Sequence, residues 1–245
     1  MNILIWEVFH MRDSIKRIAQ QFIVSHFPES DIVLIGGSAV YGNLTTESDI
    51  DLIIMDETET PRIECYHFLG WKIEAFIFTA LSLEVEFQTA RYIGMPTIIK
   101  MCAEGLLIED KQGKGKELQQ EAKKLYEQGP QPWDEDQVNK ARYQMTDFLS
   151  DFRSSEDFEE SLFILNKLIN TLTELFLRAD GHWFGEGKWV ARNLKSYDKD
   201  MCDKLVKYTK TYMNTNDKTE LISFIQSTLD HYGGELFVGY KRFFL

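Results

Sequence analysis

The stretch IGGSAVYGNLTTESDIDLIIM, residues 35–55, decides the fold of this chain. An apolar run ends in two glycines and a serine, and after a short polar segment a second apolar run carries Asp49 and Asp51. Alternate side chains of a strand share a face, so the two aspartates face one way and Ile50 and Leu52 the other. Carboxylates held side by side raise each other's pKa unless a positive charge lies between them. The pattern therefore predicts a buried strand with a divalent metal on one face.

A glycine turn precedes the two aspartates. Gly36 and Gly37 end the first strand where the chain must turn sharply, and their lack of side chains lets a phosphate approach the backbone N–H groups. Ser38 adds a hydroxyl donor and can cap the short helix expected next. The oxygen ligands of Asp49 and Asp51 suit Mg²⁺, which completes its shell with water and substrate phosphate. Together the motifs predict a nucleoside triphosphate held by its phosphates over Mg²⁺.

The order of these motifs resembles the signature of a known enzyme superfamily. The Gly37-Ser38 turn, a ten-residue gap and the Asp-x-Asp strand at 49–52 resemble the DNA polymerase β-like nucleotidyltransferases, in their small-molecule branch, which modifies aminoglycosides and lincosamides. Gly42 is also typical of that branch, whereas Tyr41 stands where many antibiotic-modifying members carry a basic residue. The resemblance implies Mg²⁺-dependent transfer of a nucleoside monophosphate to an acceptor hydroxyl, with release of pyrophosphate.

The resemblance also implies a third carboxylate on a later strand, which completes the metal site and can accept the proton of the acceptor hydroxyl. Glu74 in WKIEAFIF, residues 71–78, is the candidate, because it shares a face with aromatic residues and a carboxylate there needs a partner. Glu84 and Glu86 fall in the predicted helix that follows and are expected to be solvated. An exposed strand glutamate balanced by Lys72 is the alternative for Glu74.

The chain as a whole divides into two regions with different patterns. The pattern of residues 1–110 predicts a helix and short strands. In residues 111–245, segments with helical periodicity are separated by short helix-breaking stretches. The predicted class is therefore α+β: a nucleotidyltransferase domain at 1–110, with a small mixed sheet and flanking helices, followed by an all-helical bundle at 111–245. The expected segments are a helix at 11–27, strands at 31–37, 49–55 and 71–78, a helix at 79–90, and helices at 116–128, 133–152, 157–180, 199–213 and 218–232.

The segment GHWFGEGKWVARNLK, residues 181–195, interrupts the helical pattern with three glycines, two tryptophans and three basic residues. Members of the resembled branch often present a basic residue of the second domain to the triphosphate. Lys188 is the candidate for that role. The alternative is a lysine in solvent at the start of a helix.

Composition and charge restrict the partners and the setting. The formal net charge of −12 disfavours nucleic acid, because binding a phosphate backbone relies on clustered Lys and Arg. The start of the chain lacks the pattern of a signal peptide, and no apolar run approaches the roughly 20 residues that span a bilayer. The three cysteines are few and scattered. These features predict a cytoplasmic, reducing setting without membrane contact. A monomer and a homodimer both stay open.

The sequence predicts an adenylyltransferase-like enzyme that moves AMP from ATP, or the nucleotide of another triphosphate, to a hydroxyl of a small molecule. The acidic chain suits a cationic acceptor such as an aminoglycoside, which would make the protein an antibiotic-resistance enzyme. One alternative is a nucleotide-binding regulatory or antitoxin-like module with little catalysis, although three retained carboxylates argue against it. The other is a transferase acting on protein or RNA, of which RNA is disfavoured by charge.

Overall fold

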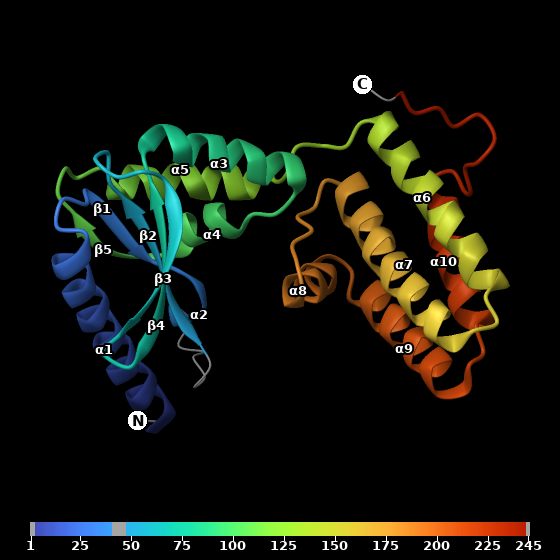
Figure 1. Ribbon diagram of the computed structural model, residues 1–245, viewed down its shortest axis with the longest axis horizontal. Helices are drawn as coiled ribbons and strands as arrows, with labels where there is room; N and C mark the ends of the chain where they lie inside the picture. Colours follow the sequence, from blue (N-terminus) through green and yellow to red (C-terminus); the bar gives the residue numbers. More distant parts are fainter. Residues whose placement is uncertain (1–2, 41–47, 244–245) are drawn as a thin grey trace. The chain divides into compact units, whose positions relative to one another are not determined.

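The computed structural model describes residues 3–40 and 48–243, and the side chains of residues 13–40 and 48–243. The chain forms two compact units, Met1–Gly129 and Pro130–Leu245 (Figure 1). Tyr41 and Gly42, which bear on the family resemblance, lie outside the described residues. Among the described residues, no helix combines the length and the apolar character needed to cross a membrane.

The first unit is built on a five-stranded mixed sheet whose strands run in the order β3-β4-β2-β1-β5. Strands β2 and β4 pair in parallel, whereas β1 pairs antiparallel with β2 and β5, and β3 pairs antiparallel with β4. The sheet therefore places β2, with its two aspartates, between β1 and β4. The strands are β1 (Ile32–Ile35), β2 (Asp49–Met55), β3 (Arg62–Phe68), β4 (Trp71–Phe78) and β5 (Leu106–Asp110).

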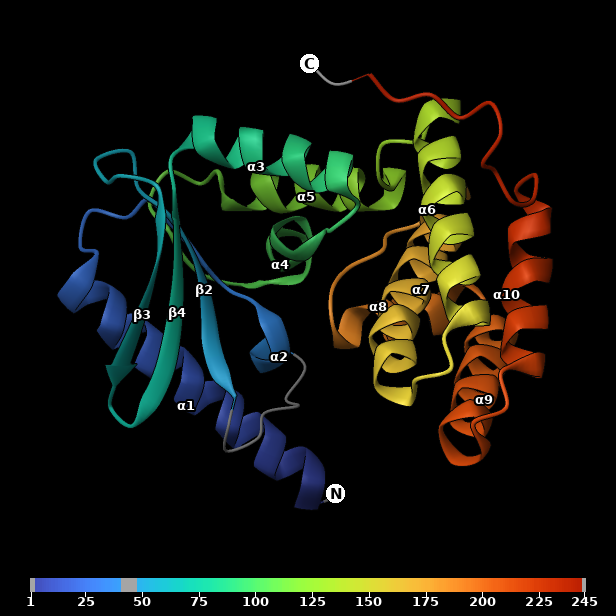
Figure 2. The same ribbon diagram turned by 45° about the vertical axis from the view of Figure 1, so that its right-hand side comes forward.

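Helix α1 (Ile3–His26) covers one face of the sheet (Figure 2). Its buried side chains, such as Phe22, form a single core with alternate residues of the strands, including Ile50 on β2 and Ile73 on β4. Because neighbouring strand residues alternate between faces, this packing turns the residues between them toward the opposite face. Asp49, Asp51 and Glu74 therefore all point away from α1.

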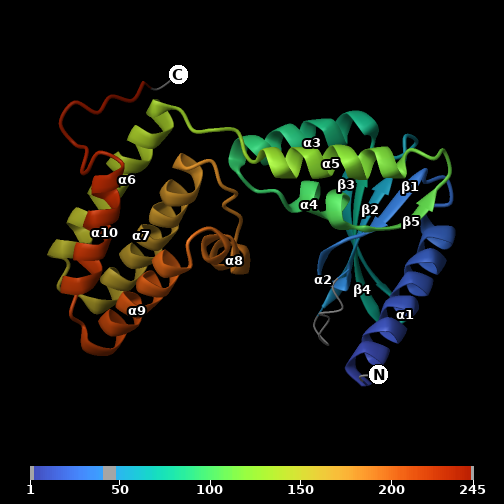
Figure 3. The ribbon, with the colours of Figure 1, turned by 180° about the vertical axis from the view of Figure 1, so that it is seen from behind.

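Three helices lie beside the sheet, on the side away from α1 (Figure 3). Thr79 caps the first of them, since its hydroxyl accepts from the N–H of Ser82 and the Ser82 hydroxyl accepts from the N–H of Thr79. This reciprocal cap ends β4 and starts the helix without a connecting loop. The helices are α3 (Ala80–Ile93), α4 (Thr97–Glu104) and α5 (Gly115–Gln128).

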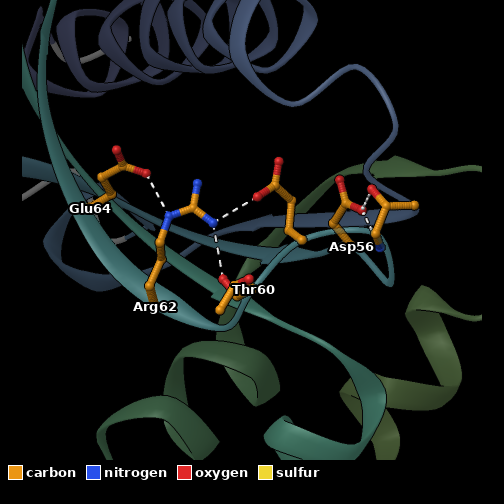
Figure 4. A network of polar contacts seen from close by, with 6 residues as sticks. Asp56, Thr60, Arg62 and Glu64 are labelled. Carbon is orange, nitrogen blue, oxygen red and sulfur yellow. Dashed lines mark hydrogen bonds and ion pairs between the residues drawn. The ribbon is translucent and has the colours of Figure 1, made fainter.

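The edge strand β3 starts at a small polar network (Figure 4). Nε of Arg62 donates to Glu64 at 2.8 Å, and Nη1 donates to Glu59 at 2.7 Å. In the preceding turn, the carboxylate of Asp56 accepts hydrogen bonds from the N–H and hydroxyl of Thr58 at 2.9 and 2.6 Å. Exposed ion pairs contribute little free energy. These contacts lie at the start of β3 and in the turn that precedes it.

The second unit is helical. Asp134 and Asp157 cap its first two helices, each accepting from the backbone N–H three residues later at 2.8 Å. Buried leucines such as Leu149, Leu172 and Leu221 lie on the inward faces of its helices. The helices of this unit are α6 (Glu135–Ser154), α7 (Phe158–Ala179), α8 (Lys188–Tyr197), α9 (Lys199–Thr215) and α10 (Thr219–His231).

The predicted α+β class is confirmed: a small mixed sheet with flanking helices precedes a helical region. The helix expected at 11–27 begins earlier, at Ile3. Strands β3 and β5 and helices α4 and α8 were not among the expected elements. Helix α5 was expected in the bundle at 111–245, but it packs on α4 and belongs to the first unit, which extends to Gly129.

Candidate metal and phosphate site

Three carboxylates meet on the face of the sheet opposite α1. Asp49 and Asp51 lie two residues apart on β2, and the parallel register pairs Asp51 with Glu74 on β4. Each of the three offers an oxygen, and these oxygens all lie within 4.8 Å of one another. All three side chains are half-buried, whereas Ile50 between the aspartates is fully buried. The register of two strands thus brings together the three residues that the sequence singled out.

The glycine turn lies directly against this cluster. Gly37, the first residue of the short helix α2 (Gly37–Val40), has φ +60, and a Cβ built on it would lie 1.7 Å from Oδ2 of Asp51. A side chain at residue 37 would therefore displace the Asp51 carboxylate as well as strain the backbone. The position of the Asp51 carboxylate against the turn therefore requires glycine at residue 37.

Gly36 supports the site in a different way. Its N–H donates to the carbonyl oxygen of Asp51 at 2.8 Å, which ties the turn to β2. A Cβ at this position would lie 2.8 Å from two side-chain atoms of Met101 on α4, so close packing also requires a glycine here. The first amides of a helix have no acceptor within it. The amides of Gly37 and Ser38 are thus better suited to a phosphate than that of Gly36, whose phosphate contact stays a prediction.

The surroundings of Glu74 affect the protonation of its carboxylate. Burial raises the pKa of Glu74 above its ordinary value, and the negative charge of Asp49 raises it further. Both causes act against the charged form, so the metal-free site holds its negative charge at a cost in free energy. A bound cation would remove that cost.

The donor set fits a hard divalent cation. All three residues supply carboxylate oxygens, the ligand type that Mg²⁺ prefers, and the cluster holds no thiolate or imidazole among its members. Two oxygens bound to one Mg²⁺ lie at most about 4.2 Å apart, because each bond is about 2.1 Å long. Small side-chain rotations would bring oxygens spread over 4.8 Å to that spacing. Asp49, Asp51 and Glu74 are therefore able to hold a divalent cation.

The structure adds neighbours that the sequence did not single out. On β4, Lys72 pairs with Asp49 in the parallel register, and on β3 Cys65 pairs with Glu74 in the antiparallel register. Paired residues of adjacent strands share a face. Cys65 therefore lies one strand away from Glu74, on the carboxylate face. The alternating pattern of residues 62–68 was the available signal for β3, but the pairing partner could be read only from the folded sheet.

Two further predicted residues lie at the starts of helices. Ser38 is half-buried and follows Gly37 in α2, so its hydroxyl belongs to the turn at the carboxylates. Lys188 is exposed and is the first residue of α8, where it follows Gly187 with φ +51. It belongs to the second unit, and its contact with a triphosphate stays a prediction.

Comparison with known proteins finds similarity among solved structures. No protein-family model matches the sequence, and no curated protein matches it either. Among solved structures, the chain is similar to a nucleotidyltransferase-like protein from Exiguobacterium sibiricum 255-15. The TM-score is 0.47 and the sequences are 13% identical, and the superposition covers 89% of this chain and 73% of that one.

Proposed function

We propose that this protein is a divalent-metal-dependent nucleotidyltransferase, which moves a nucleoside monophosphate, AMP in the first instance, from a triphosphate to a hydroxyl of a small molecule. One observation carries the proposal: the three carboxylates of β2 and β4 converge within 4.8 Å, with the turn at Gly37 packed directly on Asp51. A turn able to hold phosphate beside a site able to hold Mg²⁺ is the arrangement that a nucleoside triphosphate requires.

The residues on the two sides of the site have different proposed roles. Asp49 and Asp51 would hold the cation with Glu74, and the backbone at Gly37 and the hydroxyl of Ser38 would bind phosphate oxygens. When bound, a divalent cation supplies charge neutralisation for the triphosphate and for the departing pyrophosphate. The protein itself contributes mainly position, because its ligands are fixed by strand register and by a turn that admits only glycine.

Glu74 is suited to take the proton in this reaction. The acceptor hydroxyl gives its proton to the Glu74 carboxylate, and its oxygen forms a bond to the α-phosphorus. The bond between that phosphorus and the oxygen bridging to the β-phosphorus breaks, and pyrophosphate leaves with the electron pair. Its pairing with Asp51 puts its carboxylate beside the site where the cation and the phosphates would bind.

The acceptor proposal rests on charge. A net charge of −12 favours encounter with a cationic small molecule, and an aminoglycoside or lincosamide is therefore the first acceptor to test, with antibiotic resistance as the consequence. We further place the reaction in the reducing cytoplasm, where the three unpaired cysteines would stay thiols. A hydroxyl of a protein side chain is the second acceptor class to test. Net charge does not distinguish it from a small-molecule hydroxyl, because that choice depends on the local surface around the site.

The test is label transfer. The protein is incubated with Mg²⁺, each α-³²P-labelled nucleoside triphosphate, and a panel of aminoglycosides and lincosamides, with a protein mixture in a separate arm. We expect label in a small molecule and pyrophosphate in equal amount, and neither product from Asp49→Asn or Asp51→Asn. Binding of triphosphate and Mg²⁺ without label transfer to any acceptor would favour the regulatory alternative.

A further inference from the structure

The face that carries the carboxylates continues across β4 onto the edge strand β3. Reading across the sheet, Asp51, Glu74 and Cys65 form one row of paired residues. The next row along the strands is formed by Ile53, Phe76 and Ile63 in the same way. The metal site is thus at one side of a surface that runs on to the edge of the sheet.

The two sides of the site are not equivalent. On the β1 side, the turn at Gly37 fills the space against Asp51. On the other side, two side chains of β3 are exposed to solvent: Cys65 is exposed, and Ile63 is 60% exposed. If phosphates occupy the turn, the molecule that gives its proton to Glu74 has to approach from the side of β4 and β3. The order of the strands therefore separates a triphosphate side from an acceptor side.

Three residues form the open surface, which we call the β3 floor: Ile63, Cys65 and Phe76. Phe76 is half-buried and the other two are exposed. An exposed isoleucine paired with an aromatic side chain on an open sheet face is suited to contact with an apolar ring. The floor carries no charged side chain itself. Cys65 lies in the same row as Glu74, and Ile63 and Phe76 form the next row.

We infer that the β3 floor is the acceptor subsite, and that the acceptor is a small molecule whose reactive hydroxyl is carried on a ring with an apolar face. The ring lies on Ile63 and Phe76, with its hydroxyl directed to Glu74 and its edge beside Cys65. This inference rests on the proposed nucleotidyl transfer and deepens it. A bulky group on the Cys65 sulfur would then block the acceptor while leaving the triphosphate side open.

The chain offers a selective way to test this. Cys65 is exposed, whereas Cys102 and Cys202 are buried, and burial raises the pKa of the Cys102 thiol to about 12. Since the thiolate is the nucleophile, N-ethylmaleimide should react with the folded protein at Cys65 first. Mass spectrometry of the intact protein and of its peptides establishes that one adduct forms, and where.

The experiment compares the Cys65 adduct with the unmodified full-length protein. One assay measures α-³²P label transfer to the aminoglycoside and lincosamide panel, and the other measures binding of α,β-methylene-ATP with Mg²⁺ by calorimetry. We expect the adduct to lose label transfer by about a hundredfold, since a displacement of about 1 Å can cost that much. The dissociation constant of the triphosphate analogue should stay within about twofold.

Two control variants treated with the same reagent isolate the position of the adduct. Cys65→Ser should transfer label at the same rate before and after treatment, whatever that rate is. Cys65→Ser combined with Val24→Cys places the adduct on α1, across the sheet from the site, at a residue that is 74% exposed. The rate of that double variant should also be the same before and after treatment.

An adduct at Cys65 that transfers label at the unmodified rate would overturn the inference, and so would one that weakens triphosphate binding as much as transfer. In both outcomes the unmodified protein still transfers label, so the proposed function stands. If the unmodified protein labels no acceptor, the proposed function fails first and the acceptor subsite fails with it.

Discussion

The carboxylate of Asp51 occupies the space that a side chain on residue 37 would fill: a Cβ on Gly37 would lie 1.7 Å from Oδ2. The backbone there has φ +60, a conformation that L-residues with side chains rarely adopt. The turn after β1 and the aspartate of β2 therefore depend on each other. Whatever binds to the carboxylates is held against a turn that cannot be altered without moving them.

Gly37→Ala should consequently damage both stability and metal binding. The positive φ alone costs about 1–2 kcal/mol for a residue with a Cβ, and displacement of Asp51 adds to it. Gly113→Ala is the matched control, because Gly113 has φ +74 and nothing lies within 4 Å of its Cβ position. Chemical denaturation and Mn²⁺ titration measure the two effects. Equal losses of stability and unchanged Mn²⁺ affinity in both variants would show that residue 37 and Asp51 are independent.

Glu74→Gln should stabilise the metal-free protein at neutral pH and remove its response to metal. The substitution keeps the shape of the side chain but removes a charge that burial and Asp49 both oppose. We expect the melting temperature without metal to rise by about 2 °C, the scale of a change below 1 kcal/mol in a chain of this length. Glu84→Gln, at an exposed position on α3, is the control and should change neither quantity. A lower melting temperature for Glu74→Gln would mean that its carboxylate is already compensated in the folded protein.

The pH dependence follows from the direction of the Glu74 shift. Its folded pKa lies above the ordinary 4.5, so the unfolded chain loses this proton first as the pH rises. The contribution to stability is therefore fully present below the unfolded pKa and is lost as the pH rises through the folded pKa. Metal binding has the opposite dependence, because the cation must displace the proton. Mn²⁺ affinity should fall as the pH falls through the folded pKa, and binding in that window should release protons, measurable by calorimetry in buffers of different ionisation enthalpy. Affinity that stays constant through that window would exclude Glu74 as a ligand.

Lys188→Ala tests the proposed contribution of the second unit to triphosphate binding. If Lys188 binds phosphate, the KM for the triphosphate should rise about tenfold, which corresponds to about 1.4 kcal/mol. Lys195→Ala removes an exposed lysine from the last turn of the same helix and should leave the KM unchanged. Equal KM values in the two variants would assign Lys188 to solvent.

The features predicted best from the sequence were those set by local pattern. The Asp-x-Asp strand follows a glycine turn, and burial of Ile50 and Leu52, which alternate with the aspartates, fixes the face on which the carboxylates lie. Glu74 was chosen because the family resemblance implies a third carboxylate on a later strand, and this carboxylate shares a strand face with aromatic residues. Its pairing with Asp51 could not be read from either segment, because the parallel register of β2 and β4 depends on contacts made only in the folded sheet.

The elements that were not predicted, and helix α5, which was predicted as a helix but assigned to the other unit, have weak local signals. Strand β3 has only half-buried and exposed residues, so its alternation lacks the apolar contrast that marks a strand. Helix α4 runs for eight residues between Pro96 and Gly105 and has no side-chain cap at its start. Helix α5 has few buried residues, which made it resemble the polar helices of the second unit. Its packing on α4 is a tertiary contact, and it determines the unit to which α5 belongs.

The central claim is that Asp49, Asp51 and Glu74 form one site for a divalent cation. Titration with Mn²⁺, followed by electron paramagnetic resonance of the free ion, tests it most directly on the full chain without nucleotide. Asp51→Asn and Glu74→Gln should each weaken Mn²⁺ binding by at least about tenfold, an effect that even outer partners of metal ligands reach. Asp147→Asn, at an exposed aspartate of α6, changes the net charge equally and should bind as the unaltered protein does. Equal Mn²⁺ affinity in all four proteins would contradict the claim.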